Sequence, residues 1–161
     1  MDEGVSLVEV SRTDAPTLLR LMLAAFQEYD GVLDPPSAAH AETLETVLKR
    51  LSSGWAVLAI VGGTPAGFAF YQRRDSHLYF SRLSVLPRFR KRGLGRALIE
   101  YVEKRASEIG CVGVQLGVRL QLPHLLASYE QAGYRITKYM THEGYAEPTY
   151  VYMTNMVDGS Q

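Results

Sequence analysis

The stretch that decides the fold reads Leu83-Ser84-Val85-Leu86-Pro87-Arg88-Phe89-Arg90-Lys91-Arg92-Gly93-Leu94-Gly95-Arg96. It joins an apolar strand pattern, which Pro87 ends, to the start of a strongly amphipathic helix pattern. The first N–H groups of a helix lack partners inside the helix, and the helix dipole makes that end positive. Gly93 and Gly95 lack the Cβ atoms that would keep an anion from those groups. Charge comes from four basic residues: Arg90, Lys91, Arg92 and Arg96. The stretch therefore predicts a loop that cradles a diphosphate.

Two better-known phosphate loops are excluded by the spacing. No Gly-Lys-Ser/Thr follows, so this is not a nucleoside-triphosphate loop. The Gly-x-Gly-x-x-Gly spacing and the downstream acid of a dinucleotide fold are also missing. Taken alone, the pattern of Arg90, Gly93 and Gly95 is loose, and a solvated basic turn ahead of a surface helix is the alternative.

Hydrophobic periodicity and turn residues define the elements around this stretch. Strand patterns cover residues 5–10, 55–61, 66–72, 78–86, 112–118, 134–141 and 148–156, with a hairpin turn at 62–65. The first helix pattern begins near Thr13, has Pro16 in its first turn, and ends near Asp30-Gly31. Further helices are expected at 38–52, with Leu44, Val47, Leu48 and Leu51 on one face, at 94–109, and from Pro123 to Gly133.

This order places the chain in the α/β (α+β) class, because three consecutive strands that include a hairpin predict a mixed sheet. A length of 161 residues fits one domain over residues 1–161, with a core at about 5–156 and a loose tail at 157–161. Such a chain can bury about two-thirds of its unfolded surface without a disulfide or metal.

Composition excludes several classes of protein. Seventeen basic and seventeen acidic residues cancel, which argues against a nucleic-acid or membrane partner for the whole surface. Cys111, the single cysteine, is expected to be a plain buried thiol. No Cys, His and acidic residues have metal-ligand spacing, so no metal is expected. With no signal pattern and no bilayer-length apolar stretch, a cytoplasmic location is the default expectation.

The deciding stretch resembles the signature of the GNAT N-acetyltransferase superfamily, Arg/Gln-x-x-Gly-x-Gly/Ala after a strand that ends in Val-x-Pro. Here these elements read Val85-Leu86-Pro87 and Arg90-x-x-Gly93-x-Gly95. A second element of that family, Tyr-Glu-x-x-Gly-Phe/Tyr, is present as Tyr129-Glu130-Gln131-Ala132-Gly133-Tyr134. The resemblance covers about residues 5–156. It implies the GNAT acyl-CoA N-acyltransferase fold, a mixed central sheet of about six to seven strands flanked by about four helices.

The resemblance also implies roles. The loop Lys91-Arg92-Gly93-Leu94-Gly95-Arg96, with Arg90 before it, would bind the pyrophosphate of acetyl-CoA, the acetyl donor. Leu83-Ser84-Val85 would pair with the pantetheine arm, and a bulge there would offer an N–H to the thioester carbonyl. Tyr129 resembles the general acid that protonates the departing thiolate. The alternative for Tyr129 is core packing in register with Leu125 and Ala132, and both roles can hold together.

Two positions depart from the family pattern. Many relatives have an Asn seven residues before the tyrosine, where this chain has Leu122. Some have a Glu on the preceding strand, where the spacing places Gly117. The departures put one pantetheine contact in doubt and leave no general base to carry over.

Base and acceptor-binding residues must therefore come from elsewhere in the chain. His142, between the last two strand patterns, is the best candidate base, and an exposed loop histidine is the alternative. Glu28 and Tyr29 at the end of the first helix could hold a cationic amine, unless they are solvated helix-end residues. Arg119 and Arg82 could anchor an acidic acceptor or form structural ion pairs.

These features together predict a transferase (an acyltransferase) that moves the acetyl group to a primary amine by direct attack. The amine could belong to a small molecule or a peptide. A CoA-binding regulatory module without turnover is the alternative. A nucleic-acid protein that uses Arg88 to Arg96 is disfavoured by the neutral charge. A homodimer is common in the superfamily, although no interface signal stands out.

Overall fold

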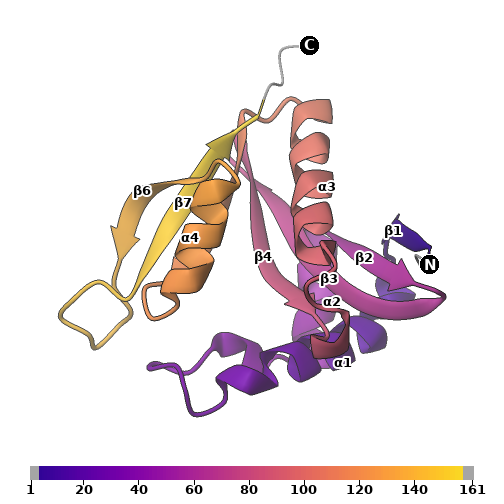
Figure 1. Cartoon of the computed structure of the whole chain (residues 1–161), viewed down its shortest axis with the longest axis horizontal. Coiled ribbons are helices and arrows are strands. Elements are labelled where there is room, and N and C mark those ends of the chain that lie inside the picture. The colour runs from indigo at the N-terminus through magenta and orange to yellow at the C-terminus, as the bar shows by residue number, and fades with distance from the viewer. Residues whose placement is uncertain (1–3, 158–161) are drawn as a thin grey trace. The chain divides into compact units, whose positions relative to one another are not determined.

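The structure of the protein, a computed structural model, describes residues 4–157. Seven strands follow the sheet order β1-β2-β3-β4-β5-β7-β6, and the described residues include four α-helices (Figure 1). The elements are β1 (Val5–Glu9), α1 (Ala15–Phe26), α2 (Leu44–Ser53), β2 (Trp55–Val61), β3 (Thr64–Arg74), β4 (His77–Val85), α3 (Leu94–Glu108), β5 (Gly113–Arg119), α4 (Pro123–Gln131), β6 (Arg135–Met140) and β7 (Tyr150–Met156). The predicted mixed sheet with four helices is confirmed.

The chain divides into two compact units. Of the described residues, 4–72 and 80–102 form the first unit, and 73–79 and 103–157 form the second. The single domain expected over residues 1–161 stays a prediction. Of the tail expected at 157–161, residues 158–161 lie outside the described residues.

The core of the first unit lies where α1 and α2 pack against β2 and β3 (Figure 1). Pro16 sits in the first turn of α1, where its missing N–H costs no hydrogen bond. The buried face of α1 repeats at helical spacing, with Leu18 and Met22 both fully buried. Opposite them lie Phe68 and Phe70 of β3, whose rings meet edge to face.

The helix expected at 38–52 is wrong at its start. A short 3₁₀ turn, η3 (Ala38–Ala41), comes first, and α2 begins only at Leu44. Glu42 is extended, with φ −69° and ψ 145°. Thr43 and Thr46 then form a reciprocal capping box that fixes the start of α2. Leu44 at this first position is 43% exposed and so leaves the predicted apolar face.

The hairpin turn between β2 and β3 is confirmed but is shorter than predicted. Gly62 and Gly63 both have positive φ, 54° and 82°, which suits a tight two-residue turn. Thr64 and Pro65 belong to β3, which is longer at both ends than the predicted strand 66–72.

The second unit is built on two antiparallel pairings, β5 with β7 and β6 with β7. Alternate residues of β5, among them Leu116 and Val118, are buried, and α4 packs against this strand. Cys111 is buried, as predicted. After α4, Gly133 is left-handed at φ 104°, and an added Cβ would lie 3.2 Å from Asn155 Oδ1. Both constraints require glycine there.

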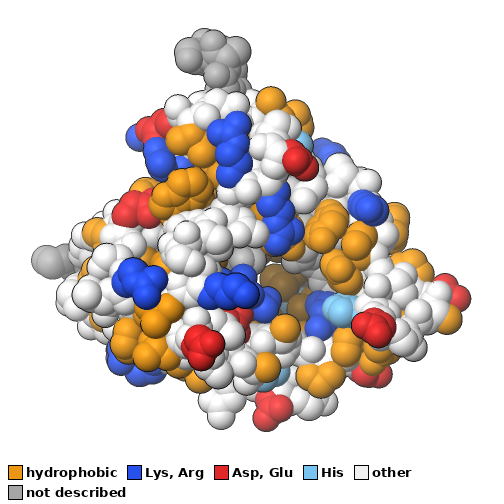
Figure 2. All heavy atoms as spheres, turned by 180° about the vertical axis from the view of Figure 1, so that it is seen from behind, with side chains coloured by type: hydrophobic (Ala, Val, Ile, Leu, Met, Phe, Trp, Pro, Cys, Tyr) orange, Lys and Arg blue, Asp and Glu red, His pale blue; other side chains and the backbone are white. Residues whose placement is uncertain are grey.

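Charged side chains are mixed over the surface. On the face in Figure 2, Lys and Arg side chains stand among acidic and apolar ones, in line with the zero net charge. Over residues 4–157, no helix combines the length and the apolar character that a bilayer crossing requires.

Candidate functional site

The predicted phosphate loop lies in the first unit, between β4 and α3. A 3₁₀ turn, η4 (Pro87–Phe89), ends the strand. Two residues of the loop are left-handed, Lys91 at φ 62° and Gly93 at φ 80°. The carbonyl of Gly93 accepts the first helical hydrogen bond, from the N–H of Ala97 at 3.0 Å. The N–H groups of Leu94, Gly95 and Arg96 thus form the first turn of α3, where a helix has no partners of its own for them.

Space remains open at this end of α3. An added Cβ at Gly95 would touch only Leu83 Cδ2, at 3.8 Å, and one at Gly93 would meet nothing within 4 Å. Protein packing therefore does not require glycine at Gly95. A small residue at this position would leave room for a bound group to approach the backbone, and a diphosphate would suit the donors present. The prediction for the loop rests on this geometry.

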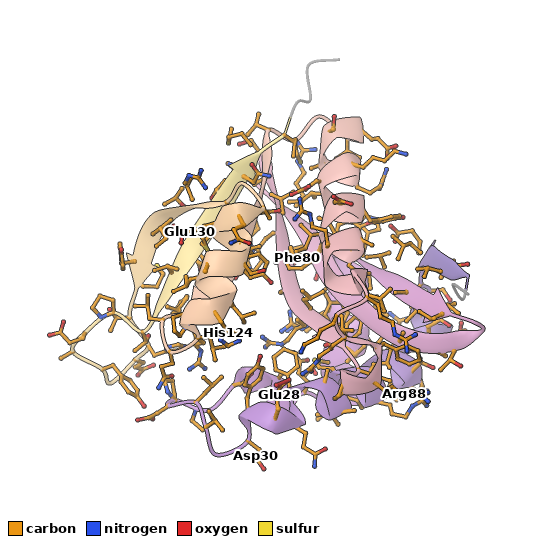
Figure 3. All side chains as sticks on the ribbon, viewed as in Figure 1. Glu28, Asp30, Phe80, Arg88, His124 and Glu130 are labelled. Atoms are coloured by element: carbon orange, nitrogen blue, oxygen red, sulfur yellow. The ribbon has the colours of Figure 1, made fainter. Side chains whose placement is uncertain are left out.

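Arg90 holds the loop in place. Its Nε donates to the carbonyl of Val85 at 2.9 Å, and its Nη2 donates to the carbonyl of Ala25 at 3.1 Å. Its third contact is an ion pair with Glu28, on the segment after α1 (Figure 3). The guanidinium that was expected to attract a polyanion thus ties the loop to β4 and to the end of α1.

The other basic side chains of the loop are less constrained. Arg88 and Arg92 both place their guanidinium groups over the ring of Phe89, at 4.7 and 5.3 Å from its centre. Arg96 pairs with Glu100 at 3.3 Å on the exposed face of α3. Lys91 is exposed.

The strand is irregular at Arg82, just before the segment Leu83 to Val85. Arg82 in the middle of β4 has φ 56°, a left-handed conformation that is rare for residues other than glycine and is found at some β-bulges. Ser84 is buried and its Oγ donates to the carbonyl of Arg82 at 2.9 Å. The bulge that the family resemblance implies in Leu83 to Val85 stays a prediction, and the left-handed residue in this part of β4 is Arg82.

Glu28 and Tyr29 lie on the 3₁₀ turn η2 (Gln27–Tyr29) that continues α1. Glu28 is occupied by Arg90, so its charge is balanced inside the first unit. Tyr29 is half-buried beside Phe26, with ring centres 5.9 Å apart. Burial, together with the charge of Glu28, raises the pKa of Tyr29, and Arg90 opposes this. Tyr29 is therefore a neutral hydrogen-bonding group at physiological pH.

Tyr129 lies near the end of α4 in the second unit, beside Glu130 (Figure 3). It is half-buried, and its ring meets that of Tyr134 edge to face at 5.9 Å. Tyr134 is fully buried, and its hydroxyl donates to Glu103 Oε2 at 2.8 Å. Packing thus explains why the second motif has glycine at Gly133 and tyrosine at Tyr134. At Tyr129, packing explains the aromatic ring but not the hydroxyl group.

His142, Arg119 and Tyr150 are brought together in the second unit. Arg119 ends β5 and is paired in register with Tyr150 of β7. The rings of His142 and Tyr150 lie 4.6 Å apart. Burial, together with the charge of Arg119, lowers the pKa of His142. Burial and Tyr152 raise the pKa of Tyr150, against the opposite effect of Arg119. The ring of His142 is therefore neutral near pH 7.

Thr149 fixes the orientation of His142. The backbone N–H of His142 donates to Thr149 Oγ1 at 2.9 Å, and the same oxygen lies 2.5 Å from His142 Nδ1. The hydroxyl has one proton to donate, and its oxygen can also accept from a ring N–H. The protonation of Nδ1 decides whether Nε2 has a free lone pair, so Thr149 sets the chemistry open to His142.

Three tyrosine side chains lie close to Gly117, the position where some relatives have a glutamate. An added Cβ at Gly117 would lie 3.1 Å from Tyr79 Oη, and the rings of Tyr152 and Tyr150 come within 3.8 and 3.9 Å. A larger side chain would have to displace Tyr79. Leu122, at the Asn position of the family, precedes α4 and makes no side-chain cap hydrogen bond.

Sequence reasoning missed a buried charge cluster in the first unit, in which the carboxylate of Glu42 contacts Thr46, Arg50 and Arg82. No motif marks it, because Glu42 and Arg82 are 40 residues apart. The cluster favours the structural ion pair for Arg82 over an acceptor anchor. The Nε2 atom of His40 is also buried, with no hydrogen-bond partner in the described part of the chain. Within that same part, no group of His, Cys, Asp and Glu could hold a metal.

Comparison with solved structures shows what this fold resembles. The ribosomal-protein-S18-alanine N-acetyltransferase of Escherichia coli matches with a TM-score of 0.76 at 18% identity, over 96% of this chain and 94% of that one. The PaiA N-acetyltransferase of Thermoplasma acidophilum, solved in complex with coenzyme A, has a TM-score of 0.79 at 16% identity, with coverage of 95% and 99%. Ard1 of Thermoplasma volcanium has a TM-score of 0.76 at 20% identity, with coverage of 95% and 97%.

Sequence comparison gives the family. No curated protein matches the chain by sequence. The family model of the Acetyltransferase (GNAT) family, in contrast, matches residues 17–134, well over half of the chain. This range takes in the deciding stretch and ends at Tyr134 of the second motif, and the solved structures share the fold. The chain belongs to the GNAT acetyltransferase family.

Proposed function

We propose that this chain is an N-acetyltransferase that moves the acetyl group of acetyl-CoA to a primary amine. The observation that carries the proposal is the open space at the first turn of α3, where Gly95 leaves backbone donors accessible. Family membership supports the reaction class. That the PaiA enzyme of similar fold was solved with coenzyme A supports the choice of donor.

The donor is held by backbone groups in this proposal. The N–H groups of Leu94, Gly95 and Arg96 bind the pyrophosphate, and the positive end of the α3 dipole favours its charge. Lys91 and Arg92 add screened positive charge from the loop. Leu83, Ser84 and Val85 receive the pantetheine arm, and the segment that follows the left-handed Arg82 offers an N–H to the thioester carbonyl.

Acetyl-CoA supplies an activated acyl group, which the amine nitrogen takes as its new C–N bond forms and the C–S bond breaks. Tyr129 donates its hydroxyl proton to the sulfur that departs, and solvent returns a proton to the phenolate. A phenol suits this role because a thiol has a pKa of about 8.5, close enough for transfer from a positioned donor. No covalent enzyme intermediate is required, in keeping with the burial of Cys111.

His142 takes the proton that the attacking amine loses. For this role Nδ1 carries the ring proton and donates it to Thr149 Oγ1, which leaves the Nε2 lone pair free. The lowered pKa keeps the ring neutral and able to accept near pH 7. Arg119, Glu28 and Tyr29 are proposed acceptor contacts. Because Glu28 already pairs with Arg90, Tyr29 is the stronger candidate of the two residues on η2.

A CoA-binding module without turnover is the second reading. It is favoured by Leu122 and Gly117, which replace an amide and a carboxylate of relatives, and by the tyrosine side chains that lie close to Gly117. Such a module would bind CoA and release no thiol with any amine.

The test is thiol release from acetyl-CoA against a panel of amines. The panel contains small primary amines, polyamines, amino acids and peptides. Peptides with an N-terminal alanine are included because the E. coli enzyme of similar fold is named for that acceptor. We expect at least one amine to stimulate release in proportion to enzyme. CoA binding by calorimetry with no stimulation by any amine would support the module instead.

A further inference from the structure

A left-handed residue inside a strand needs something to hold it there. Arg82 of β4 has φ 56°, where a side chain crowds its own backbone. Arg82 directly precedes Leu83 to Val85, the last three residues of β4. Within the first unit, the side chain of Arg82 is held by a hydrogen-bonded ion pair.

The anchor of Arg82 in this ion pair is the carboxylate of Glu42. Arg82 Nε donates to Glu42 Oε2 at 3.0 Å, and Arg50 Nη2 lies 2.8 Å from the same oxygen. Thr46 Oγ1 donates to the other oxygen, Oε1, at 2.6 Å. The Glu42 side chain is only 4% exposed, against 22% for Arg82 and 34% for Arg50. Both carboxylate oxygens therefore have charge-assisted or short hydrogen bonds out of water.

The anchor is rigid because it belongs to the start of α2. Thr46 sits in the capping box of α2, and Arg50 extends from the same helix toward Glu42. Burial alone would raise the pKa of Glu42, but hydrogen bonds from Thr46 and the two arginines hold that pKa below its ordinary value. Glu42 is thus an anion at neutral pH.

The strand on the other side leaves equally little freedom. An added Cβ at Gly67 of β3 would lie 2.4 Å from the carbonyl oxygen of Ser84 and 3.2 Å from Val85 Cα. Only glycine admits the backbone that follows Arg82. Two independent features, Glu42 through a side chain and Gly67 through the backbone, fix this segment within the first unit.

We propose that Glu42 is a positioning residue that holds Arg82 left-handed and so aims the backbone of Leu83 to Val85 at the thioester arm. The inference rests on the proposed function for its catalytic consequence, although not for its conformational part. Glu42 touches no reacting atom and acts through Arg82. Because misplacement by 1 Å can cost about 100-fold in rate, the expected effect is on turnover rather than on CoA affinity.

The test compares residues that differ in their tolerance of positive φ. Arg82→Gly removes the ion pair but adopts φ 56° without crowding, whereas Arg82→Val removes the same pair and resists that φ. Glu42→Gln keeps the shape of the side chain and removes its charge. NMR chemical shifts of Cα and Cβ report the backbone conformation of residue 82. Because glycine has no Cβ, the shifts of Leu83 are compared instead in the Arg82→Gly variant. Turnover, CoA affinity and unfolding are measured alongside.

We expect Glu42→Gln and Arg82→Val to shift residue 82 out of the left-handed region and to lower kcat by about 10- to 100-fold. CoA affinity should change less than about threefold in both, since the loop is intact. Arg82→Gly should keep wild-type shifts at Leu83 and most of kcat, and adding Glu42→Gln to it should change neither further.

Left-handed shifts in folded Glu42→Gln, or equal shifts and kcat in Arg82→Gly and Arg82→Val, would overturn the proposal. If Glu42→Gln does not fold, the two Arg82 variants carry the comparison, because Glu42 keeps Thr46 and Arg50 in both. If the wild type turns over no amine, the proposed function fails, and the NMR comparison still decides the role of Glu42.

Discussion

The two units assemble their candidate site residues in different ways. In the first unit, the proposed phosphate cradle consists of backbone groups from one continuous stretch, residues 83–96, braced by Arg90. In the second, Arg119, His142 and Tyr150 come from β5, the loop before β7 and β7 itself. The residues proposed to bind acetyl-CoA are thus local in sequence and include glycines. The candidate acceptor residues are assembled by side chains over a longer range, and single substitutions should separate the two.

The largest expected effect is that of Tyr129→Phe. Loss of the proton donor should lower kcat by about 100- to 10,000-fold, the usual contribution of acid–base catalysis. The Kd of CoA should stay within about twofold, since the ring still packs on Tyr134. Thiol release and calorimetry measure the two quantities. A kcat within threefold of the wild type would remove Tyr129 from the chemistry.

Gly95→Val tests the other region and should affect binding instead. A branched side chain at the first turn of α3 would occupy the space in which we propose that the phosphates bind. Loss of one or two charge-assisted hydrogen bonds, at about 1.5–3 kcal/mol each, corresponds to at least about tenfold weaker CoA binding. The free energy of unfolding should be unchanged or slightly higher, because valine has a higher helix propensity than glycine.

Gly95→Ala is the matched control for the valine variant. Its Cβ meets only Leu83, at 3.8 Å, so CoA affinity should stay near that of the wild type. Equal affinities in all three proteins would show that the phosphates bind elsewhere.

His142→Gln should change the pH profile. The pKa of His142 is lowered, so the base is available above that pKa, and kcat/KM should fall as the pH drops through it, below about 6.5. In the glutamine variant this acid limb should vanish, with kcat/KM lower by about 10- to 100-fold at neutral pH. An acid limb that survives the substitution would assign the proton to water or to the amine.

The smallest effects are expected at the brace between the loop and α1. Arg90→Lys loses hydrogen bonds to the carbonyls of Val85 and Ala25, at about 1 kcal/mol each. Glu28→Gln loses only a surface pair, 44% exposed on the Glu28 side, and should cost less than about 1 kcal/mol. Urea unfolding measures both. A larger loss in Glu28→Gln than in Arg90→Lys would contradict this order.

Much of this fold could be predicted from sequence because its signals are local. The strand before Pro87, the glycines of the loop and the helical stripe of α3 lie within one continuous segment, so their pattern indicates their geometry. Gly62 and Gly63 marked their turn in the same way. The predicted start of α2 is too early, because Thr43 caps the helix, although its capping box with Thr46 is also a local signal.

The rest could not be predicted because it depends on partners far apart in sequence. Charge at Arg90 suggested a phosphate contact, yet Ala25, Glu28 and Val85 surround it. Nothing near Glu42 indicates that Arg82 will meet it 40 residues later. A left-handed Arg82 is likewise invisible in sequence, because residues other than glycine rarely adopt that conformation and no local pattern marks it.

The central claim, that the first turn of α3 holds the pyrophosphate, is tested most directly by a CoA titration followed through backbone amide NMR signals. We predict saturable shifts that are largest for the amides of Gly93, Leu94, Gly95 and Arg96, and weak in Gly95→Val. Saturable binding with these four amides unmoved, or no binding at millimolar CoA, would contradict the account.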